Sequence, residues 1–456
     1  MEITLGTMLK INAAKYPRDE AVIFDDARAT YSQLNDRVNK RANALLSLGV
    51  KKGDHVATLA SNCLELVETI YAIWRIGAVL VPLNIRLSPG ELTYIVDHSD
   101  VSTVLFLDTL NETITQIKPQ LEEVKRFFSF GKNPVEGFID FEVKTDQQST
   151  QEPSGEIKEE EVATILYTAG TTGKPKGVVA THKNWIWMNI NSTAGRTREP
   201  GMKSMTVYPL FHAGSIANLT GNIFAGYTLV ILKAFDPKQM LEFIQKEKIN
   251  RLGNPPTVYK MILQQPEISS YDLSSVRYLM SGSEVMPDET RNQLKKVFCN
   301  AGIIDNYGMT ETCGGTTSRS EEYTAEKPFS VGLPHISELV RVVDGQGEDV
   351  ASGEVGEIIV RGPNVMREYY KDPEKTAEAL RNGWLYTQDL AAVVLKQGEE
   401  MTPEEVIEFS KQNLASFKKP KFVEFIDSLP KSPIGKVLRS KLKERFINKA
   451  LLPKSC

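Results

Sequence analysis

The sequence predicts an α/β protein built on mostly parallel sheets flanked by helices, and three observations support this fold class. With 456 residues, 41% apolar and 25% charged, the chain is large enough for two or three domains with buried cores. Short apolar runs of strand length alternate with longer stretches whose apolar residues recur at helical spacing. This alternation starts with a complete strand–helix–strand unit and recurs later, and such units pack as parallel sheets covered by helices.

The first of these units lies in the N-terminal part of the chain. Residues 31–49 are predicted to form an amphipathic helix, with Ser32 as the candidate N-cap and Gly49 as the stop signal. A buried strand, a second helix and a second strand are then predicted at residues 55–61, 63–77 and 78–84. The same alternation recurs at residues 204–211, 227–232, 237–250 and 276–284. The polar stretch 144–161 is predicted to be a loop or a linker between subdomains.

Composition argues against membrane-spanning, disulfide-rich and zinc-binding classes. The N-terminus has no apolar segment behind a basic start, and no apolar run reaches bilayer length, so we expect a cytoplasmic protein without a membrane span. Four cysteines lie far apart without paired spacing, and five histidines form no HxxxH pattern. Neither a disulfide framework nor a transition-metal site is therefore expected.

Charge is distributed unevenly along the chain. Residues 411–456 carry twelve Lys and Arg against three acidic residues, whereas the whole chain has a net charge of −4. A basic segment of this kind suits a polyanion, although a solvated helix face is the alternative. The segment has no nucleic-acid-binding signature, so a nucleotide or phosphorylated cofactor is favoured over nucleic acid.

The stretch LYTAGTTGKPKGVV, residues 166–179, places glycines, threonines and lysines between two apolar runs. It is not a Walker A motif, because the residue five positions after Gly170 is Pro175. Glycines let backbone N–H groups approach an anion, while hydroxyls add donors and lysines add positive charge. The side chains concerned are Thr168, Thr171, Thr172, Lys174 and Lys176. We favour phosphate binding, and a glycine-rich surface turn is the alternative.

Further segments carry groups that would complete a nucleotide site. IIDNYGMTET offers an aromatic platform at Tyr307, followed by Thr310 and Glu311, and a carboxylate close to bound phosphates can hold Mg²⁺. The LMSGSE segment, residues 279–284, fits a turn pressed against a planar ring. Taken singly, such a glutamate is usually a solvated carboxylate and such a tyrosine usually packs in the core.

Two residues near the C-terminus belong to the same set. Asp389, in NGWLYTQDLA, could accept hydrogen bonds from ribose hydroxyls. Lys436 follows a glycine in a turn that precedes a helix, which suits a lysine delivered into a site by a moving segment.

Six segments in order resemble the motif series of the adenylate-forming superfamily, which includes acyl-CoA synthetases, firefly luciferase and peptide-synthetase adenylation domains. They are YTAGTTGKPKGV, PLFHAGS, YGMTE, GEIIVRGPNVMREYY, GWLYTQDLA and PKSPIGKVLR. The resemblance runs from about residue 5 to 448 and is greatest to fatty-acyl-CoA and aryl-CoA ligases. It implies a large N-terminal domain of mixed sheets flanked by helices, a hinge and a small α+β C-terminal domain. We expect these at residues 1–388, 389–392 and 393–456.

The resemblance also implies a reaction in two steps. A carboxylate attacks the α-phosphate of ATP to give an acyl-adenylate and pyrophosphate, and the thiol of coenzyme A then displaces AMP to give a thioester. Because one anion is brought onto another, Mg²⁺ and lysines would be needed to screen the repulsion and stabilise the reacting phosphorus. ATP, Mg²⁺ and coenzyme A are therefore the expected cofactor and co-substrates.

Site residues follow from matching the motifs position by position. The expected catalytic residues are Lys436, Glu311, Thr310 and His212, and the expected metal ligands are Glu311 and Thr168. The expected phosphate-binding residues are Thr168, Gly170, Thr171, Thr172, Gly173 and Lys176. The expected nucleoside-binding residues are Ser281, Gly282, Ser283, Glu284, Asp305, Asn306, Tyr307, Gly308 and, for the ribose, Asp389. His212 matches the position beside the substrate carboxylate, and a buried structural histidine is the alternative.

The chain also departs from the family pattern. Ala169 replaces a small hydroxyl residue of the loop, and Gln388 stands where the family has glycine. A whole block is missing after the hinge motif, where the family carries a second ribose-binding residue, the hinge residue and a loop lining the coenzyme A tunnel. Only 66 residues, 391–456, remain for the second domain, which is marginal for independent folding.

Three functional hypotheses remain open from the sequence. The first is an acyl-CoA ligase for a medium- or long-chain fatty acid, or alternatively for an arylpropenoic acid of the coumarate or ferulate type. The second is an acyl-adenylate former without transfer to coenzyme A, and the third is an ATP- and acyl-binding protein with impaired turnover. The expected partners are small molecules, without nucleic acid, and both peripheral membrane contact and a homodimer are left open.

Overall fold

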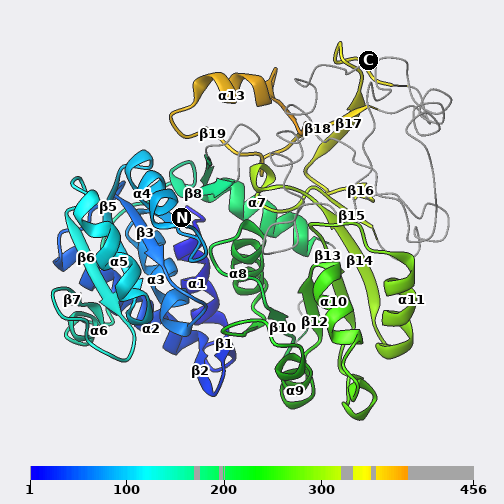
Figure 1. Ribbon diagram of the computed structural model, residues 1–456, viewed down its shortest axis with the longest axis horizontal. Coiled ribbons are helices and arrows are strands. Elements are labelled where there is room, and N and C mark those ends of the chain that lie inside the picture. Colours follow the sequence, from blue (N-terminus) through cyan, green and yellow to red (C-terminus); the bar gives the residue numbers. More distant parts are fainter. Residues whose placement is uncertain are drawn as a thin grey trace, which may run out of the picture. The chain divides into compact units, whose positions relative to one another are not determined.

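The computed structural model describes residues 2–168, 175–194, 199, 201–319, 332–350 and 356–388 (Figure 1). The chain divides into two compact units. The described part of the larger unit consists of residues up to 337, with the gaps given above, together with residues 363–373. The described part of the smaller unit comprises residues 338–350, 356–362 and 374–388.

The larger unit contains an eight-stranded sheet with the strand order β19-β9-β8-β4-β3-β5-β6-β7. Its strands are β3 (His55–Leu59), β4 (Val79–Pro82), β5 (Val101–Leu107), β6 (Arg126–Phe130), β7 (Ile139–Asp140), β8 (Val162–Thr168), β9 (Lys176–Thr181) and β19 (Glu368–Tyr369). The strands from β8 to β7 pair in parallel, whereas β9 and β19 add antiparallel pairs at one edge. The predicted strand–helix–strand unit is confirmed, since β3 and β4 are direct parallel neighbours joined by α3 (Leu64–Arg75).

A nine-stranded sheet in the same unit has the order β16-β15-β14-β13-β12-β10-β11-β1-β2. Its strands are β1 (Glu20–Phe24), β2 (Ala27–Thr30), β10 (Lys203–Thr206), β11 (Thr228–Ile231), β12 (Arg251–Asn254), β13 (Tyr278–Ser281), β14 (Gly302–Tyr307), β15 (Thr317–Arg319) and β16 (Leu333–Pro334). The six strands from β1 to β14 pair in parallel, and β2, β15 and β16 are antiparallel. Mostly parallel sheets, as the alternation predicted, are therefore combined with antiparallel edges.

Helices cover both sheets and fill the space between them. The remaining α-helices of this unit are α1 (Leu5–Lys15), α2 (Tyr31–Ser47), α4 (Pro89–His98), α5 (Asn111–Ile117), α6 (Phe141–Asp146), α7 (His182–Thr193), α8 (Ala213–Ala225), α9 (Pro237–Glu247), α10 (Pro256–Leu263) and α11 (Asp288–Val297). Short 3₁₀ turns are η1 (Asp108–Leu110), η2 (Lys118–Gln120), η3 (Ile268–Ser270) and η4 (Thr310–Thr312).

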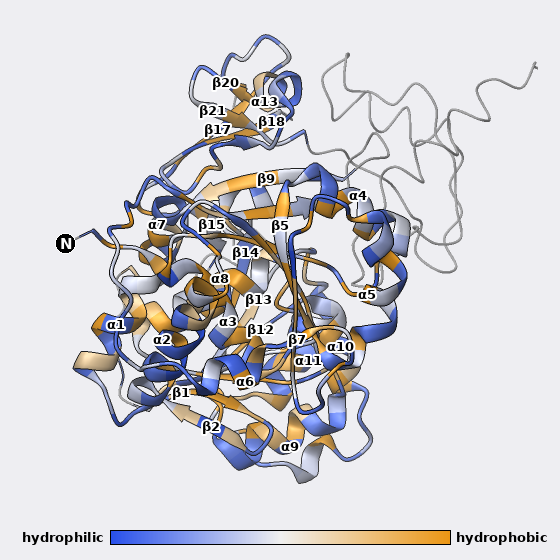
Figure 2. Cartoon of the chain, turned by 90° about the vertical axis from the view of Figure 1, so that its left-hand side faces the viewer, coloured by the Kyte–Doolittle hydropathy of each residue, from blue (hydrophilic) through white to orange (hydrophobic). Residues whose placement is uncertain are grey.

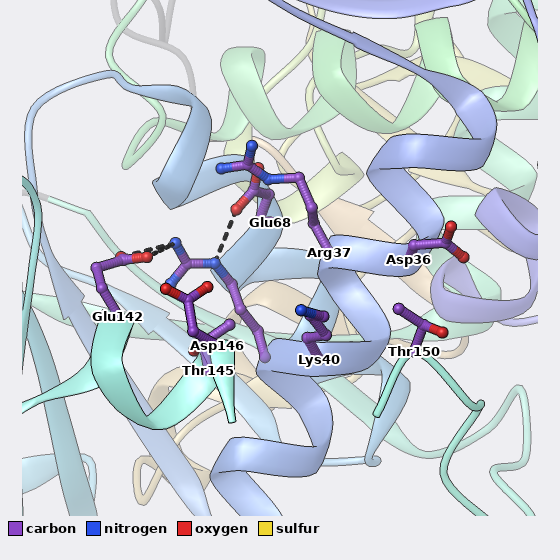
Figure 3. A pocket seen from close by; sticks show the side chains of 9 residues that line it. Asp36, Arg37, Lys40, Glu68, Glu142, Thr145, Asp146 and Thr150 are labelled. Atoms are coloured by element: carbon purple, nitrogen blue, oxygen red, sulfur yellow. Dashed lines mark hydrogen bonds and ion pairs between the residues drawn. The ribbon is translucent and has the colours of Figure 1, made fainter. Parts of the chain in front are cut away.

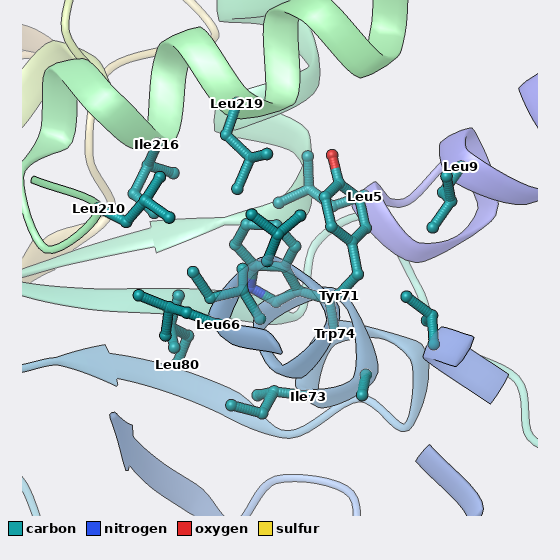
Figure 4. Close-up of a cluster of buried hydrophobic side chains, with 14 of the residues drawn as sticks. Leu5, Leu9, Leu66, Tyr71, Ile73, Trp74, Leu80, Leu210, Ile216 and Leu219 are labelled. Atoms are coloured by element: carbon teal, nitrogen blue, oxygen red, sulfur yellow. The ribbon is translucent and has the colours of Figure 1, made fainter. Parts of the chain in front are cut away.

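The largest core cluster draws apolar side chains from both sheets and from α1, α2, α3, α7 and α8. Figure 4 shows its centre, where Trp74 and Tyr71 of α3 gather with Leu5 of α1 and Leu219 of α8. Separate clusters join α9, α10 and α11 to the nine-stranded sheet and α4 and α5 to the eight-stranded sheet. Figure 2 shows that hydrophobic residues are concentrated in the strands.

The start of α2 corrects one sequence expectation. Ser32 was the expected N-cap, but the cap is Thr30, whose hydroxyl accepts a hydrogen bond from the Gln33 N–H at 3.2 Å. The Gln33 side chain in turn accepts from the Thr30 N–H at 2.9 Å. Gln or Glu is the favoured residue three positions after such a cap, and Thr30 has Gln33 there, whereas Ser32 has Asn35. The end is as predicted, because Gly49 follows the helix with a φ of +85°.

The polar stretch at 144–161 is a loop within the larger unit rather than a linker between subdomains. Beyond α6 it contains no helix or strand before β8. It is tied to α2, because Asn39 donates to the Thr150 carbonyl at 2.8 Å and Asn43 donates to those of Ser149 and Gln151 at 2.9 Å.

The described part of the smaller unit is a four-stranded antiparallel sheet with the order β17-β18-β21-β20. Its strands are β17 (Leu339–Val343), β18 (Glu357–Arg361), β20 (Leu380–Arg381) and β21 (Trp384–Tyr386), and α13 (Pro373–Ala379) begins at the boundary between the units. Gln388, which replaces a family glycine, has a φ of +54°, a conformation that glycine adopts without strain. The expected hinge and C-terminal domain lie outside the described residues.

Candidate active site

The glycine-rich stretch joins β8 to β9 in an antiparallel hairpin, as the two flanking apolar runs suggested. Thr168 and Lys176 are the cross-strand partners that flank the connecting loop. Gly177 must be glycine here, because a Cβ would lie 2.9 Å from the Ile165 side chain and 3.1 Å from the Tyr167 ring. The expected site residues Gly170, Thr171, Thr172, Gly173, Asp389 and Lys436 lie outside the described residues.

The expected nucleoside-binding residues come together at the carboxyl ends of β13 and β14. Ser281 and Asp305 are parallel partners, so the Ser281–Glu284 turn lies beside Tyr307 and Gly308. Asn306 donates from its side chain to the Ser281 carbonyl at 3.3 Å, and this contact ties the two strand ends together. Ligands of open α/β sheets bind at such carboxyl ends.

Glycine is required in the turn that follows Tyr307. A Cβ on Gly308 would lie 2.5 Å from the Cα of Gly315, so the chain folds back on itself at backbone contact distance. The Tyr307 carbonyl accepts from the Thr316 N–H at 2.8 Å. Asn364, which lies in a distant segment, stabilises the same turn, since its side chain donates to the carbonyls of Thr312 at 3.0 Å and Gly315 at 3.1 Å.

Two neighbouring residues of β14 face opposite sides of the sheet. The Asp305 carboxylate accepts from the guanidinium groups of Arg291 in α11 and Arg319 in β15, so its charge is already committed to two buried arginines. The Asn306 side chain instead accepts from the Ser318 hydroxyl at 2.8 Å on the other face. The expected contact of Asp305 with a nucleotide stays a prediction.

Glu311 lies in η4 directly after this turn, and it is only 7% exposed. Its carboxylate accepts a hydrogen bond of 2.7 Å from the phenol of Tyr369 in β19. The Lys176 ammonium lies 4.9 Å from the centroid of the Tyr369 ring. Burial, together with the nearby Glu311 charge, raises the pKa of Tyr369 well above its ordinary value. Tyr369 therefore connects Lys176 at the base of the hairpin with Glu311, beside Thr310.

His212 is the N-cap of α8 and lies half-buried. Its Nδ1 accepts from the Gly214 N–H at 3.1 Å, which places the proton of the neutral ring on Nε2. The ring stacks on that of Tyr208, with centroids 5.8 Å apart and planes 12° from parallel. Burial raises the pKa of Tyr208, and the Ser283 side chain partly offsets this rise. Tyr208 thus lies next to His212 and close to the nucleoside-binding turn.

The donor set fits a cation that arrives with phosphates rather than a resident metal. In the part of the chain that the structure describes, no group of three or more His, Cys, Asp or Glu side chains could hold a metal ion. Glu311 can supply one carboxylate oxygen, and Mg²⁺ commonly binds one or two carboxylates together with substrate phosphates and water.

Among the residues that the structure describes, no helix is long and apolar enough to cross a membrane.

A cavity of about 220 Å³ lies elsewhere in the larger unit, between α2, α3 and α6 (Figure 3). Four of its charged residues are paired with one another. The buried Arg41 binds Glu68 at 2.8 Å and Glu142 at 2.7 Å, and Arg37 binds Glu68 at 2.5 Å. This network joins three helices and contains none of the expected site residues.

Comparison with known proteins gives the chain a family. A family model described as "AMP-binding enzyme" matches residues 9–370, and one described as "AMP-binding enzyme C-terminal domain" matches residues 389–436. The chain belongs to the AMP-binding enzyme family. The resemblance seen in the six sequence motifs is thereby confirmed, and the protein is an enzyme of the adenylate-forming group of acyl-CoA and aryl-CoA ligases.

Similar curated proteins of this AMP-binding family carry different substrate names. A feruloyl-CoA synthase from an Amycolatopsis species is 29% identical over 504 positions, which cover 97% of this chain and 99% of the relative. A long-chain-fatty-acid–CoA ligase from Bacillus subtilis (strain 168) is 30% identical over 530 positions, with 97% and 94% coverage. Both alignments are longer than the 456-residue chain, so the relatives carry residues that this AMP-binding enzyme lacks. The expected shortening of the C-terminal domain is confirmed.

Solved structures agree on the fold. A Mycobacterium tuberculosis fatty acyl CoA synthetase matches with a TM-score of 0.84 and 25% identity, covering 98% of this chain and 99% of that one. An anthranilate CoA ligase in complex with anthranoyl-AMP matches with a TM-score of 0.85 and 23% identity, covering 99% and 98%, and this likeness supports the fold alone. The α/β fold class with mixed sheets is thereby confirmed.

Sequence reasoning missed three residues that organise this site: Tyr208, Asn364 and Tyr369. Asn364 and Tyr369 lie within the motif GEIIVRGPNVMREYY, and Tyr208 precedes PLFHAGS by one residue. A tyrosine beside an apolar run is ordinarily interpreted as packing, and nothing in local spacing shows that Tyr369 meets a carboxylate 58 residues away. Membership of the motif was the available signal.

Proposed function

We propose that the protein is an ATP-dependent acid–thiol ligase that converts a medium- or long-chain fatty acid to acyl-AMP and transfers the acyl group to coenzyme A. The observation that carries this proposal is the buried Glu311 carboxylate, held between η4 and β19 beside the base of the glycine-rich hairpin. A carboxylate there, with Lys176 close to its tyrosine partner, combines the anion and cation that a metal–triphosphate complex needs.

Each residue has a distinct role in the proposed adenylation step. Mg²⁺, when bound with ATP, would be held by Glu311 and would neutralise phosphate charge. Thr168 and Lys176 would bind the phosphates at the base of the hairpin, and the Tyr307 ring would support the adenine. His212 can donate from Nε2 to the substrate carboxylate, because its Nδ1 is already used as an acceptor. Lys436 would stabilise the charge that develops on the α-phosphate.

The proposed acyl chain would lie between α8 and the nine-stranded sheet. Leu279 and Ile303 are buried against α9, α10 and α11 on one face of that sheet. Side chains alternate along a strand, so Met280 and Ile304 point to the opposite face, where both are half-buried. Exposed apolar surface on central strands suits an apolar substrate, which supports the fatty-acid assignment. The long-chain-fatty-acid–CoA ligase among the relatives supports it as well.

An arylpropenoic acid is the second candidate substrate, and Asn218 of α8 favours it. A Cβ on Gly253 would lie 3.2 Å from the Asn218 Oδ1, so this polar group lies close to β12. Its Nδ2 is held by the Gly214 carbonyl at 2.9 Å, which leaves Oδ1 as an acceptor for a substrate hydroxyl. The feruloyl-CoA synthase among the relatives is consistent with this alternative.

The shortened C-terminal domain favours a second candidate function, an acyl-adenylate former whose thioester step is slow. Carboxylate-dependent ATP–pyrophosphate exchange tests the first step, with octanoate, palmitate, coumarate and ferulate as substrates. Thioester formation on the same preparation tests the second. ATP binding without exchange on any acid would leave only an ATP-binding protein and would overturn the proposed activity.

A further inference from the structure

We propose that Tyr369 is a positioning residue that orients Glu311 toward the metal–triphosphate group of bound ATP. This inference rests on the proposed function, because it assumes that Glu311 faces a nucleotide-borne cation. It assigns a role to a residue outside the expected catalytic and binding set.

The position of Tyr369 is fixed by backbone hydrogen bonds of the residues before and after it. Within the eight-stranded sheet, Tyr369 is the cross-strand partner of Val178 in β9. The Arg367 N–H donates to the Val179 carbonyl at 2.9 Å, and the Tyr370 N–H donates to the Gly177 carbonyl at 2.7 Å. Since strand pairing is anchored before and after it, the Tyr369 side chain leaves a rigid element rather than a loop.

Glu311 is held by the same segment at two points. Its backbone carbonyl accepts from the Met366 N–H at 2.7 Å, and its Oε1 accepts from the Tyr369 hydroxyl at 2.7 Å. A glutamate has three rotatable side-chain bonds, and anchoring one carboxylate oxygen removes most of that freedom before a ligand arrives. The second oxygen, Oε2, is then the one available to a cation.

The orienting hydroxyl can be removed while the Tyr369 ring is kept. Groups that orient a metal-binding carboxylate typically change metal affinity about 10-fold to 100-fold when they are removed. The Lys176 ammonium lies over the ring, not the hydroxyl, so Tyr369→Phe removes the orienting group and keeps that contact.

The test compares Tyr369→Phe with Tyr370→Phe in the full chain. Tyr370 is the next residue and its hydroxyl donates to Asp100 at 2.7 Å, so its replacement deletes a similar contact outside the site. ATP binding is titrated with and without Mg²⁺, and the Mg²⁺ concentration for half-maximal ATP binding is recorded. We expect Tyr369→Phe to raise that concentration about 10-fold or more and to leave Mg²⁺-free ATP binding unchanged, with Tyr370→Phe like the parent.

A double-mutant cycle separates positioning from general stability. In a Glu311→Gln background, Tyr369→Phe should cause no further change in the Mg²⁺ requirement, because the carboxylate it orients is gone. Parent-like Mg²⁺ dependence in Tyr369→Phe, an additive effect in the cycle, or loss of cooperative unfolding in this variant would each overturn the positioning role. Absence of Mg²⁺-dependent ATP binding in the parent would instead reject the proposed function itself.

Discussion

Replacing Glu311 by glutamine removes one negative charge from the candidate site while retaining its shape. The Gln amide oxygen can still accept the Tyr369 hydroxyl that now binds Oε1 at 2.7 Å, and the backbone contact with Met366 does not depend on the side chain. The free energy of unfolding should therefore change by less than about 1 kcal/mol. What is lost is an anionic ligand in a position that is 7% exposed.

The expected effect on adenylation is large because the described residues offer no cluster of acidic side chains that could replace Glu311. Removing one preorganised electrostatic group from a shielded active site typically lowers the rate about 10²- to 10³-fold, or about 2.7–4 kcal/mol. We expect Glu311→Gln to lose at least about 10²-fold in carboxylate-dependent pyrophosphate exchange at saturating ATP, and part of this loss should be recovered at high Mg²⁺.

The measurement needs a matched charge control. Glu242 lies exposed on α9, and Glu242→Gln makes the same chemical change away from the site. Exchange rates for both variants are compared with unfolding curves in urea. Full exchange activity in a folded Glu311→Gln variant would refute the assignment of Glu311 to the metal–phosphate site.

Two further predictions rest on the sequence motifs and two on the structure. The double variant Thr171→Val, Thr172→Val removes two phosphate donors but keeps the β-branched side-chain bulk. Calorimetry should show weaker ATP binding, with an unchanged melting temperature. ATP affinity equal to that of the parent would mean that the stretch is only a structural turn. Lys436→Ala should abolish pyrophosphate exchange, and thioester formation in the parent should be at least about 10²-fold slower than in a full-length relative. Single-turnover assays of both steps check this, and equal rates would show that the shortened domain still completes the site. Arg41→Met should lower the free energy of unfolding by about 3–5 kcal/mol in urea, because the buried Glu68 carboxylate loses the buried one of its two arginine partners, and a loss below about 1 kcal/mol would contradict this. Burial lowers the pKa of His182 to about 3, so the unfolded chain takes up a proton below about pH 6.5 and the native state does not. The free energy of unfolding should therefore fall by about 2 kcal/mol from pH 7 to pH 5 because of His182. His182→Gln should lack this contribution to the pH dependence of the free energy of unfolding.

Several parts of the fold could be predicted from local pattern. Strand β3, helix α3 and strand β4 lie where periodicity placed them, because burial on a sheet or a helix face imposes spacings of about 2 and 3.6 residues on the sequence itself. The cap of α2 was misplaced although its signal was local. Thr30 rather than Ser32 caps the helix because Thr30 and Gln33 form a reciprocal pair of hydrogen bonds. A prediction from Ser32 alone overlooks that pair.

The sequence by itself determined the order of the elements, the mostly parallel sheets and the motif residues at strand ends. Only the tertiary structure decided which of those residues meet: Tyr369 with Glu311, Tyr208 with His212, and Arg41 with Glu142. Helix and strand periods arise from contacts between residues a few positions apart, so they leave a regular trace in the sequence. A hydrogen bond across 58 residues depends on strand pairing and core packing that bring distant segments together, and no local spacing records it.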